Sequence, residues 1–278
     1  MTAPIPPTAR TGPRIHTVAV WQCLQWLRLG WRDLFRCGWL SLAHGIVLAA
    51  FGAGLLAVAH HRFWLLAGAF SGFLVVAPVL ATSLYAMSRA LEHGAPINLG
   101  LLRNTWLSWQ RARFVERGGY WCLVRFGLLL ALAGTGWVLT SAALITLLAP
   151  VPILTPLDFL RHVVLDPHGL LFEFWLALGG VLAAPIFASS VVSMPLLLDR
   201  KVSVMDAVLT SWRVVLANPV PMAAWALLIM VLVLAGFAAA MLGLVVVMPW
   251  LGHASWHAYR DLVDASALPQ RATGAGER

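Results

Sequence analysis

Charged residues are absent from several long stretches of the chain, and these stretches predict where it crosses a membrane. No Asp, Glu, Lys or Arg occurs between Arg36 and Arg62, or between Arg62 and Arg89. A membrane-spanning helix needs about 20 mostly apolar residues, and stretches of that kind recur as far as Arg260. We predict six spans, at about 39–59, 63–87, 121–148, 171–198, 222–236 and 239–258.

The last apolar stretch admits two divisions. Residues 214–259 contain no charged residue, although one helix needs only about half of that length. Two short spans that turn near Ala235 and Gly236 fit; the alternative is one span with an interfacial helix from Pro249 onwards. With six spans, 17 of the 19 Lys and Arg residues lie on the side of both chain ends, against 14 with five. Because cytoplasmic loops carry the Lys and Arg excess, we predict six spans with both termini cytoplasmic.

Composition also favours a membrane protein over a soluble enzyme. Of the 278 residues, 60% are hydrophobic and 11% are charged, whereas soluble domains carry about 25% charged residues. The net charge of +8 fits topology better than nucleic-acid binding, because the arginines lie at segment ends rather than in one basic stripe. We therefore predict an all-α membrane protein, a six-span bundle at residues 22–264, between disordered cytoplasmic tails at 1–21 and 265–278.

A threefold pattern accompanies the predicted spans. Each span that returns toward the cytoplasm carries a valine pair and then a proline, a candidate helix kink: Pro78, Pro195 and Pro249. Each outward span follows a segment that pairs tryptophan with arginine, and these residues are candidates for the lipid interface: Trp31, Arg32, Trp109, Arg111, Trp212 and Arg213. The predicted unit is a cytoplasmic interfacial helix followed by a helical hairpin. The alternative is chance, since Val, Leu and Pro are common in spans.

Two polar strings are candidates for chemistry. His253 and His257 are four residues apart and share a helix face, a spacing that can hold a metal or haem. The alternative is an interfacial helix end, where His, Trp and Tyr contact the headgroup layer. Asp199 and Arg200 close the fourth span, either as a salt-bridge network or as a gating element. Neither string supplies a third metal ligand, so we predict no metal and no cofactor.

Free thiols are predicted for the three cysteines, Cys23, Cys37 and Cys122. Their number is odd, no CxxC motif occurs, and they lie on the predicted cytoplasmic side or just inside a span. The N-terminal tail lacks an apolar core, so no cleaved signal peptide is expected.

Four strings resemble an uncharacterised bacterial family of predicted integral membrane proteins with a domain of unknown function. They are residues 30–34 (GWRDL), 71–78 (SGFLVVAP), 195–200 (PLLLDR) and 252–263 (GHASWHAYRDLV). The resemblance spans about residues 22–264. It implies a multi-pass protein of the bacterial inner membrane, and it implies no activity, because the family has none assigned.

The sequence thus favours a non-enzymatic role. No Walker A, GxSxG or HExxH motif occurs, and no charged residue lies at mid-bilayer depth in any predicted span. The first hypothesis is a scaffold or regulatory protein that binds anionic lipid headgroups at the cytoplasmic face, with a possible membrane-protein partner and no nucleic acid. The second is a channel or carrier for a small neutral solute, with spans 2, 4 and 6 lining the path. The third is a haem or metal protein that uses His253 and His257. The predicted path of the second hypothesis is rimmed by Ser71, Thr82, Ser83, Ser189, Ser190, Ser193 and His253.

Overall fold

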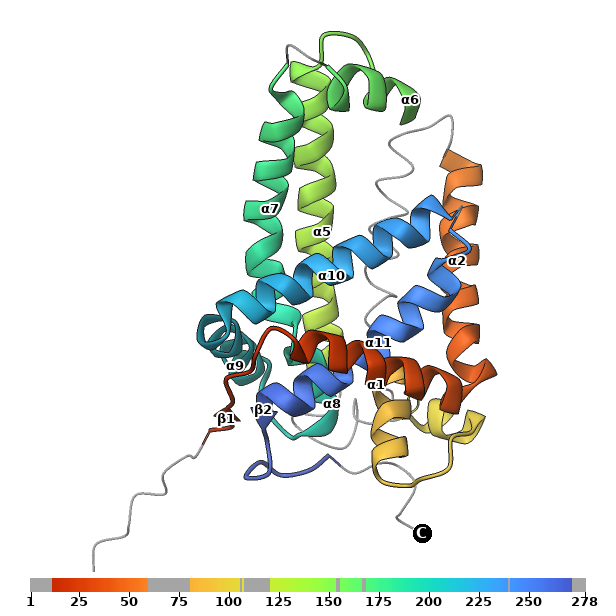
Figure 1. Ribbon diagram of the computed structural model, residues 1–278, viewed down its shortest axis with the longest axis vertical. Coiled ribbons are helices and arrows are strands. Elements are labelled where there is room, and N and C mark those ends of the chain that lie inside the picture. The colour runs from red at the N-terminus through yellow and green to blue at the C-terminus, as the bar shows by residue number, and fades with distance from the viewer. Residues whose placement is uncertain are drawn as a thin grey trace, which may run out of the picture.

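Helices make up most of the structure, a computed structural model that describes residues 12–59, 81–105, 107, 121–153, 156–166, 169–239 and 241–271 (Figure 1). Residues 81–92 and 99–105 are helical. The named elements are β1 (Arg14–Ile15), α1 (Gln22–Cys37), α2 (Trp39–Ala59), α5 (Trp121–Leu148), α6 (Pro156–Phe159), the π-helical turn η1 (Leu160–Val164), α7 (Leu171–Ser190), α8 (Ser193–Asp199), α9 (Val204–Ala217), α10 (Pro219–Ala238), α11 (Leu244–Leu262) and β2 (Val263–Asp264). An all-α membrane protein is therefore the fold class.

Apolar helices of membrane-spanning length occur at three places in the described residues. They are Val124–Leu148 in α5, Leu171–Asp199 across α7 and α8, and Pro219–Ala238 in α10. These agree with the predicted spans at 121–148, 171–198 and 222–236. In addition, α1 and the first part of α2 pass the same test as a pair, bent by 103°. α2 covers the predicted first span, whereas most of the second, 63–87, lies outside the described residues.

The last helical hairpin differs from the sequence prediction. The predicted turn near Ala235 and Gly236 is wrong, because α10 continues to Ala238 and the turn contains Met241, whose φ is 65°. Gly236 instead lies where α10 closely approaches the residue that precedes α11. A Cβ on Gly243 would lie 2.8 Å from the Cα of Gly236. α11, the predicted sixth span, is not one of the apolar candidates, since its second half is polar.

Proline positions affect two helices differently. α7 ends at Ser190 and α8 begins at Ser193, so the break lies one turn before Pro195. A proline has no N–H for the carbonyl four residues back and its ring displaces that carbonyl, which accounts for the break. Pro249, in contrast, lies inside the continuous helix α11.

The core is built around α11, which packs against α1 and α2 (Figure 1). Glycines allow both contacts: a Cβ on Gly30 of α1 would lie 2.8 Å from the Cα of Ala254, and one on Gly45 of α2 would lie 2.7 Å from the Cα of Val245. Beside this crossing, the buried rings of Trp26 and Trp225 meet edge to face with centroids 5.5 Å apart. Residues at opposite ends of the sequence therefore share one core.

Both ends of the described chain are attached to the helices. Arg14 and Ile15 pair antiparallel with Asp264 and Val263 as β1 and β2. Beyond β2, Gln270 forms an isolated bridge with Arg200. The predicted disordered tails thus include residues with defined backbone contacts at their inner ends, because carbonyl and amide groups of the two ends satisfy each other. Residues 1–11 and 272–278 lie outside the described residues.

Candidate functional site

The helix α1 buries one face and exposes an apolar line beside it. The buried face consists of Cys23, Trp26, Leu27, Gly30, Asp33, Leu34 and Cys37. The neighbouring line contains Leu24, Trp31 and Phe35, spaced by seven and four residues so that they share a direction. These side chains are 62%, 40% and 68% exposed. A large apolar surface on a helix that bends by 103° into α2 is typical of a helix lying in a membrane interface.

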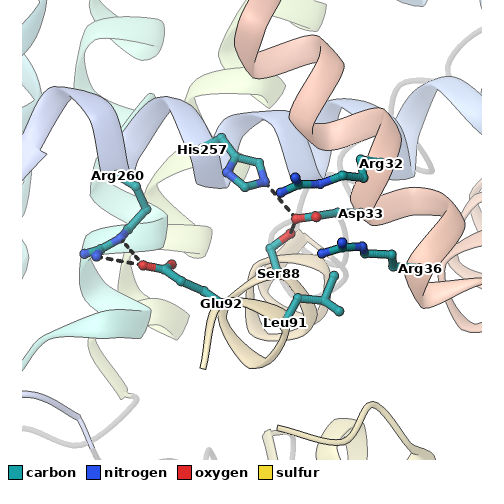
Figure 2. A pocket seen from close by; sticks show the side chains of 8 residues that line it. All are labelled: Arg32, Asp33, Arg36, Ser88, Leu91, Glu92, His257 and Arg260. Carbon is teal, nitrogen blue, oxygen red and sulfur yellow. Dashed lines mark hydrogen bonds and ion pairs between the residues drawn. The ribbon is translucent and has the colours of Figure 1, made fainter. Parts of the chain in front are cut away.

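A pocket opens on the opposite edge of α1, between this helix, the helical segment 81–92 and α11 (Figure 2). Its volume is about 170 Å³. The residues that line it are Arg32, Asp33, Arg36, Ser88, Leu91, Glu92, His257 and Arg260. Arg32 and Arg36 are exposed, one turn apart, and extend from α1 toward the side chains of the other two elements (Figure 2).

Asp33 is held by two polar side chains from other helices. Its Oδ2 lies 2.7 Å from Nε2 of His257 and accepts a 2.9 Å hydrogen bond from the hydroxyl of Ser88. Burial alone would raise the pKa of Asp33, but the hydrogen bonds from His257 and Ser88 and the charge of His257 outweigh it and lower the pKa. Asp33 is therefore a carboxylate, and its charge is already compensated at the wall of the pocket.

Glu92 is the other carboxylate of the pocket, and it too has partners. Arg260 approaches its Oε1 with two nitrogens, Nη2 at 2.8 Å and Nε at 3.0 Å. The indole N–H of Trp256 donates to Oε2 over 3.1 Å. Both carboxylates of the pocket are thus engaged by groups other than Arg32 and Arg36.

From Asp33 a hydrogen-bonded chain runs into the core. The Ser88 hydroxyl donates to Asp33, so the Nδ1–H of His253 donates to the Ser88 oxygen over 2.7 Å. Nε2 of His253 then accepts from the hydroxyl of Ser41 on α2. His253 is fully buried, and both of its ring nitrogens are used.

The contacts of His253 do not support the haem or metal hypothesis. A ligating nitrogen must be free to bind the ion, and both ring nitrogens of His253 are already hydrogen-bonded. Within the residues that the structure describes, no group of three or more His, Cys, Asp or Glu side chains could hold a metal.

A second buried network surrounds Asp199. Its Oδ1 lies 3.0 Å from Nε of Arg89, and its Oδ2 lies 2.9 Å from both Nε of Arg200 and the Tyr259 hydroxyl, which donates. The guanidinium of Arg89 also donates to the carbonyl of Arg271, and that of Arg200 to the carbonyl of Leu268, each over 2.9 Å. This network attaches the C-terminal segment to the helices, and a gating role for Asp199 and Arg200 stays a prediction.

The four predicted polar residues therefore divide between two networks. His253 and His257 belong to the Asp33 network, and Asp199 and Arg200 to the other. The neighbours Ser88 and Arg89 supply one residue to each. Asp33, Ser88, Arg89, Glu92 and Ser41 were not among the predicted site residues. For Asp33 a signal existed, since helical spacing places this carboxylate on the apolar face with Trp26 and Gly30.

The other predicted interface residues are placed in part. On α9, Trp212 and Arg213 are exposed, and the Trp212 indole N–H donates to the Ser189 hydroxyl over 3.0 Å. Trp109, Arg111 and Pro78 lie outside the described residues. The role of these side chains at a lipid interface stays a prediction.

Of the residues predicted to rim a solute path, four are buried, and Ser189 and Ser190 are half-buried. Thr82, Ser83, Ser193 and His253 are each fully buried, and Ser193 donates to the carbonyl of Ala207 over 3.1 Å. None of the predicted path residues lines the pocket beside α1, and Ser71 lies outside the described residues. The structure thus gives no support to the solute path.

Comparison with known proteins supports the resemblance drawn from the sequence. Residues 65–199 match the model of a family described as predicted integral membrane protein (DUF2189). The chain is similar to DUF2189 proteins over that range, just under half of its length. The match contains the string 71–78 and most of 195–200, whereas 30–34 and 252–263 lie outside it. No curated protein and no solved structure matches the chain.

Proposed function

We propose that this protein is a non-enzymatic integral protein of the bacterial inner membrane that holds α1 in the cytoplasmic interface and binds anionic lipid headgroups there. The observation that carries the proposal is the exposed apolar line of α1, Leu24, Trp31 and Phe35, on a helix bent by 103° from the apolar helix α2. A helix in that orientation can bury the line among acyl chains while α2 crosses the bilayer.

Arginines on the same helix supply the complementary charge. Arg28, Arg32 and Arg36 are all exposed on α1. Basic residues near an anionic membrane surface each contribute about 1 kcal/mol of attraction. The proposal includes six crossings with both termini cytoplasmic, supported by the 17 of 19 basic residues that this topology places on one side. In it, the apolar first half of α11 enters the bilayer and the polar second half packs under α1.

Depth measurement on α1 tests the proposal. In full-length protein carrying Cys122→Ser, single cysteines replace Phe35 or, as the matched control on the same helix, the exposed Gln25, and each is labelled with bimane. After reconstitution, lipids brominated on the acyl chain should quench the label at position 35 several-fold more strongly than the label at 25. Equal quenching at the two positions would show that α1 does not lie with its apolar line in the bilayer.

Lipid preference and topology give two further tests. Anionic phosphatidylglycerol should raise the thermal midpoint of the detergent-solubilised protein more than zwitterionic phosphatidylcholine, and salt should weaken the effect, because the Debye length falls from about 10 Å at 0.1 M to about 3 Å at 1 M. A lipid-independent midpoint would contradict the proposal. A tag placed after Arg278 should be accessible only from the cytoplasm.

A further inference from the structure

Two like charges one turn apart on α1 face a pocket whose carboxylates are occupied. Arg32 and Arg36 are at positions i and i+4, a spacing at which like charges repel. Asp33 is engaged by His257 and Ser88, and Glu92 by Arg260 and Trp256. The local charge of the two α1 guanidiniums is therefore not balanced by the carboxylates that line the pocket.

Two arginines of α1 reach into the pocket from the same side. Arg32 and Arg36 extend from α1 toward His257 and Ser88, while Arg260 lies across the pocket and is turned toward Glu92 (Figure 2). Asp33 is a positioning residue here, because it fixes His257 and Ser88 at the back of the pocket without leaving its own charge uncompensated. Because Asp33 and Glu92 are paired with His257 and Arg260, these two carboxylates do not compete with a ligand for the arginines of α1.

The chemistry that fits this arrangement is a phosphate group. Guanidinium groups bind phosphate oxygens through paired, charge-assisted N–H···O bonds. The volume of about 170 Å³ exceeds that of several water molecules, at about 30 Å³ each, so a phosphate and its substituent have room. The pocket lies on the same helix as the apolar line, on the other edge of its buried face, so an α1 that lies at the headgroup level would hold the pocket at the depth of lipid phosphates.

We infer that Arg32 and Arg36 bind the phosphate of a net-anionic ligand in the pocket between α1, the helical segment 81–92 and α11. This inference rests on the proposed function, since it assumes that α1 lies at the headgroup level. It adds a specific site to that function: two arginines of α1 recognise the ligand, whereas the remaining basic residues of the surface contribute only nonspecific attraction.

Calorimetric titration of the full chain in a nonionic detergent tests the site. The probes are short-chain phosphatidylglycerol, short-chain phosphatidylcholine and inorganic phosphate. The test variant is Arg32→Gln/Arg36→Gln. The matched control is Arg14→Gln/Lys201→Gln, which removes the same charge from exposed positions outside α1 that do not line the pocket. All four side chains are exposed, so both variants should keep the thermal midpoint of the parent protein.

The test variant should bind phosphatidylglycerol at least about tenfold more weakly than the parent, because it loses two charge-assisted contacts. The control should lose less than about threefold. Phosphatidylcholine should bind more weakly than phosphatidylglycerol to the parent. Binding of inorganic phosphate that the test variant loses would show that the phosphate group alone is recognised, and binding of the lipid alone would identify a headgroup as the ligand.

Three results would overturn the inference: equal losses in the two double variants, equal affinity for the two lipids, or no binding of any probe. These outcomes are separable from failure of the proposed function. If the bimane label at position 35 is quenched while the pocket variant binds like the parent, only the inference fails. If the label at position 35 is quenched no more than the one at 25, the proposed function fails irrespective of the titrations.

Discussion

Replacing Gly45 by alanine should force α11 away from α2. A Cβ at this position would lie 2.7 Å from the Cα of Val245 and 2.6 Å from its carbonyl carbon, and closer still to the carbonyl oxygen. Ordinary van der Waals contacts of a Cβ begin at about 3.4 Å, and contacts under 3.0 Å essentially never occur. The obstacle is backbone, so no rotamer change can relieve it, and the helices must separate by on the order of 1 Å.

The cost of this separation follows from overpacking. Added methyl groups in packed cores destabilise proteins by about 1–3 kcal/mol, and a backbone obstacle places Gly45→Ala in the upper half of that range, at about 2–3 kcal/mol. For a domain of this size, about 1 kcal/mol corresponds to roughly 2–4 °C in the thermal midpoint. We therefore expect the midpoint to fall by about 4–12 °C.

The same helix provides the control. A Cβ on Gly54 of α2 would meet nothing within 4 Å, and alanine is favoured over glycine inside a helix by up to about 1 kcal/mol. Both variants can be measured by thermal unfolding in detergent, with intrinsic tryptophan fluorescence as the signal. Gly54→Ala should leave the midpoint unchanged or slightly higher. If the two variants unfold at the same temperature, the direct contact between α2 and α11 is refuted.

Three further predictions concern the buried polar and thiol groups. Burial, with a contribution from Asp33, raises the pKa of Cys37 to about 12, and Cys37 and Cys23 should react with maleimide in the folded protein at least about 100-fold more slowly than free cysteine. Asp33→Asn should lower the free energy of unfolding by about 2 kcal/mol at pH 7. Because the pKa of Asp33 is lowered, the stabilisation by its carboxylate is complete above the ordinary pKa of 3.8 and is lost as the pH falls below that value. Asp199→Asn should lower the free energy of unfolding by about 3 kcal/mol, since it leaves buried arginines without their carboxylate. Tyr259→Phe should lower it by about 1 kcal/mol. Thermal unfolding in detergent measures both losses.

Each of these outcomes has a clear opposite. Rapid alkylation of Cys37 before unfolding would show that it is not buried in the core. Asp33→Asn should flatten the acid limb of a stability-against-pH curve, so an unchanged limb would remove the assigned role of this carboxylate. Equal losses from Asp199→Asn and Tyr259→Phe would mean that the arginines around Asp199 do not depend on its charge.

Long apolar helices were predictable because their signal is local. The predicted stretches 39–59 and 121–148 coincide with α2 and α5. A lipid-exposed helix must be apolar along its whole length, and charged residues at its ends mark where it stops. The end of α10 was misplaced for the same physical reason: Gly236 lies in a uniformly apolar stretch, where a glycine required by close helix contact looks like a glycine required by a turn.

The pocket was not predictable because it depends on which helices meet. Asp33, Ser88 and His257 are separated by 55 and 169 positions in the chain, yet their side chains are hydrogen-bonded. The spacing of His253 and His257 showed that they share a helix, and it could not show that Ser41 and Ser88 occupy both nitrogens of His253. Periodicity records the face of one helix; the partner of that face is determined by packing.

The long sequence separation between α2 and α11 has a consequence for biosynthesis. This helix supplies the main packing surface of α1 and α2, but Leu244–Leu262 is made long after both of them. At ribosomal rates of about 5–20 residues per second, roughly 10–40 s separate the synthesis of α2 from that of α11. During that interval α1 is without its main packing partner, and Asp33 is without His257. A polypeptide that terminates before residue 244 would remain in this incomplete state, where membrane quality-control proteases could recognise it.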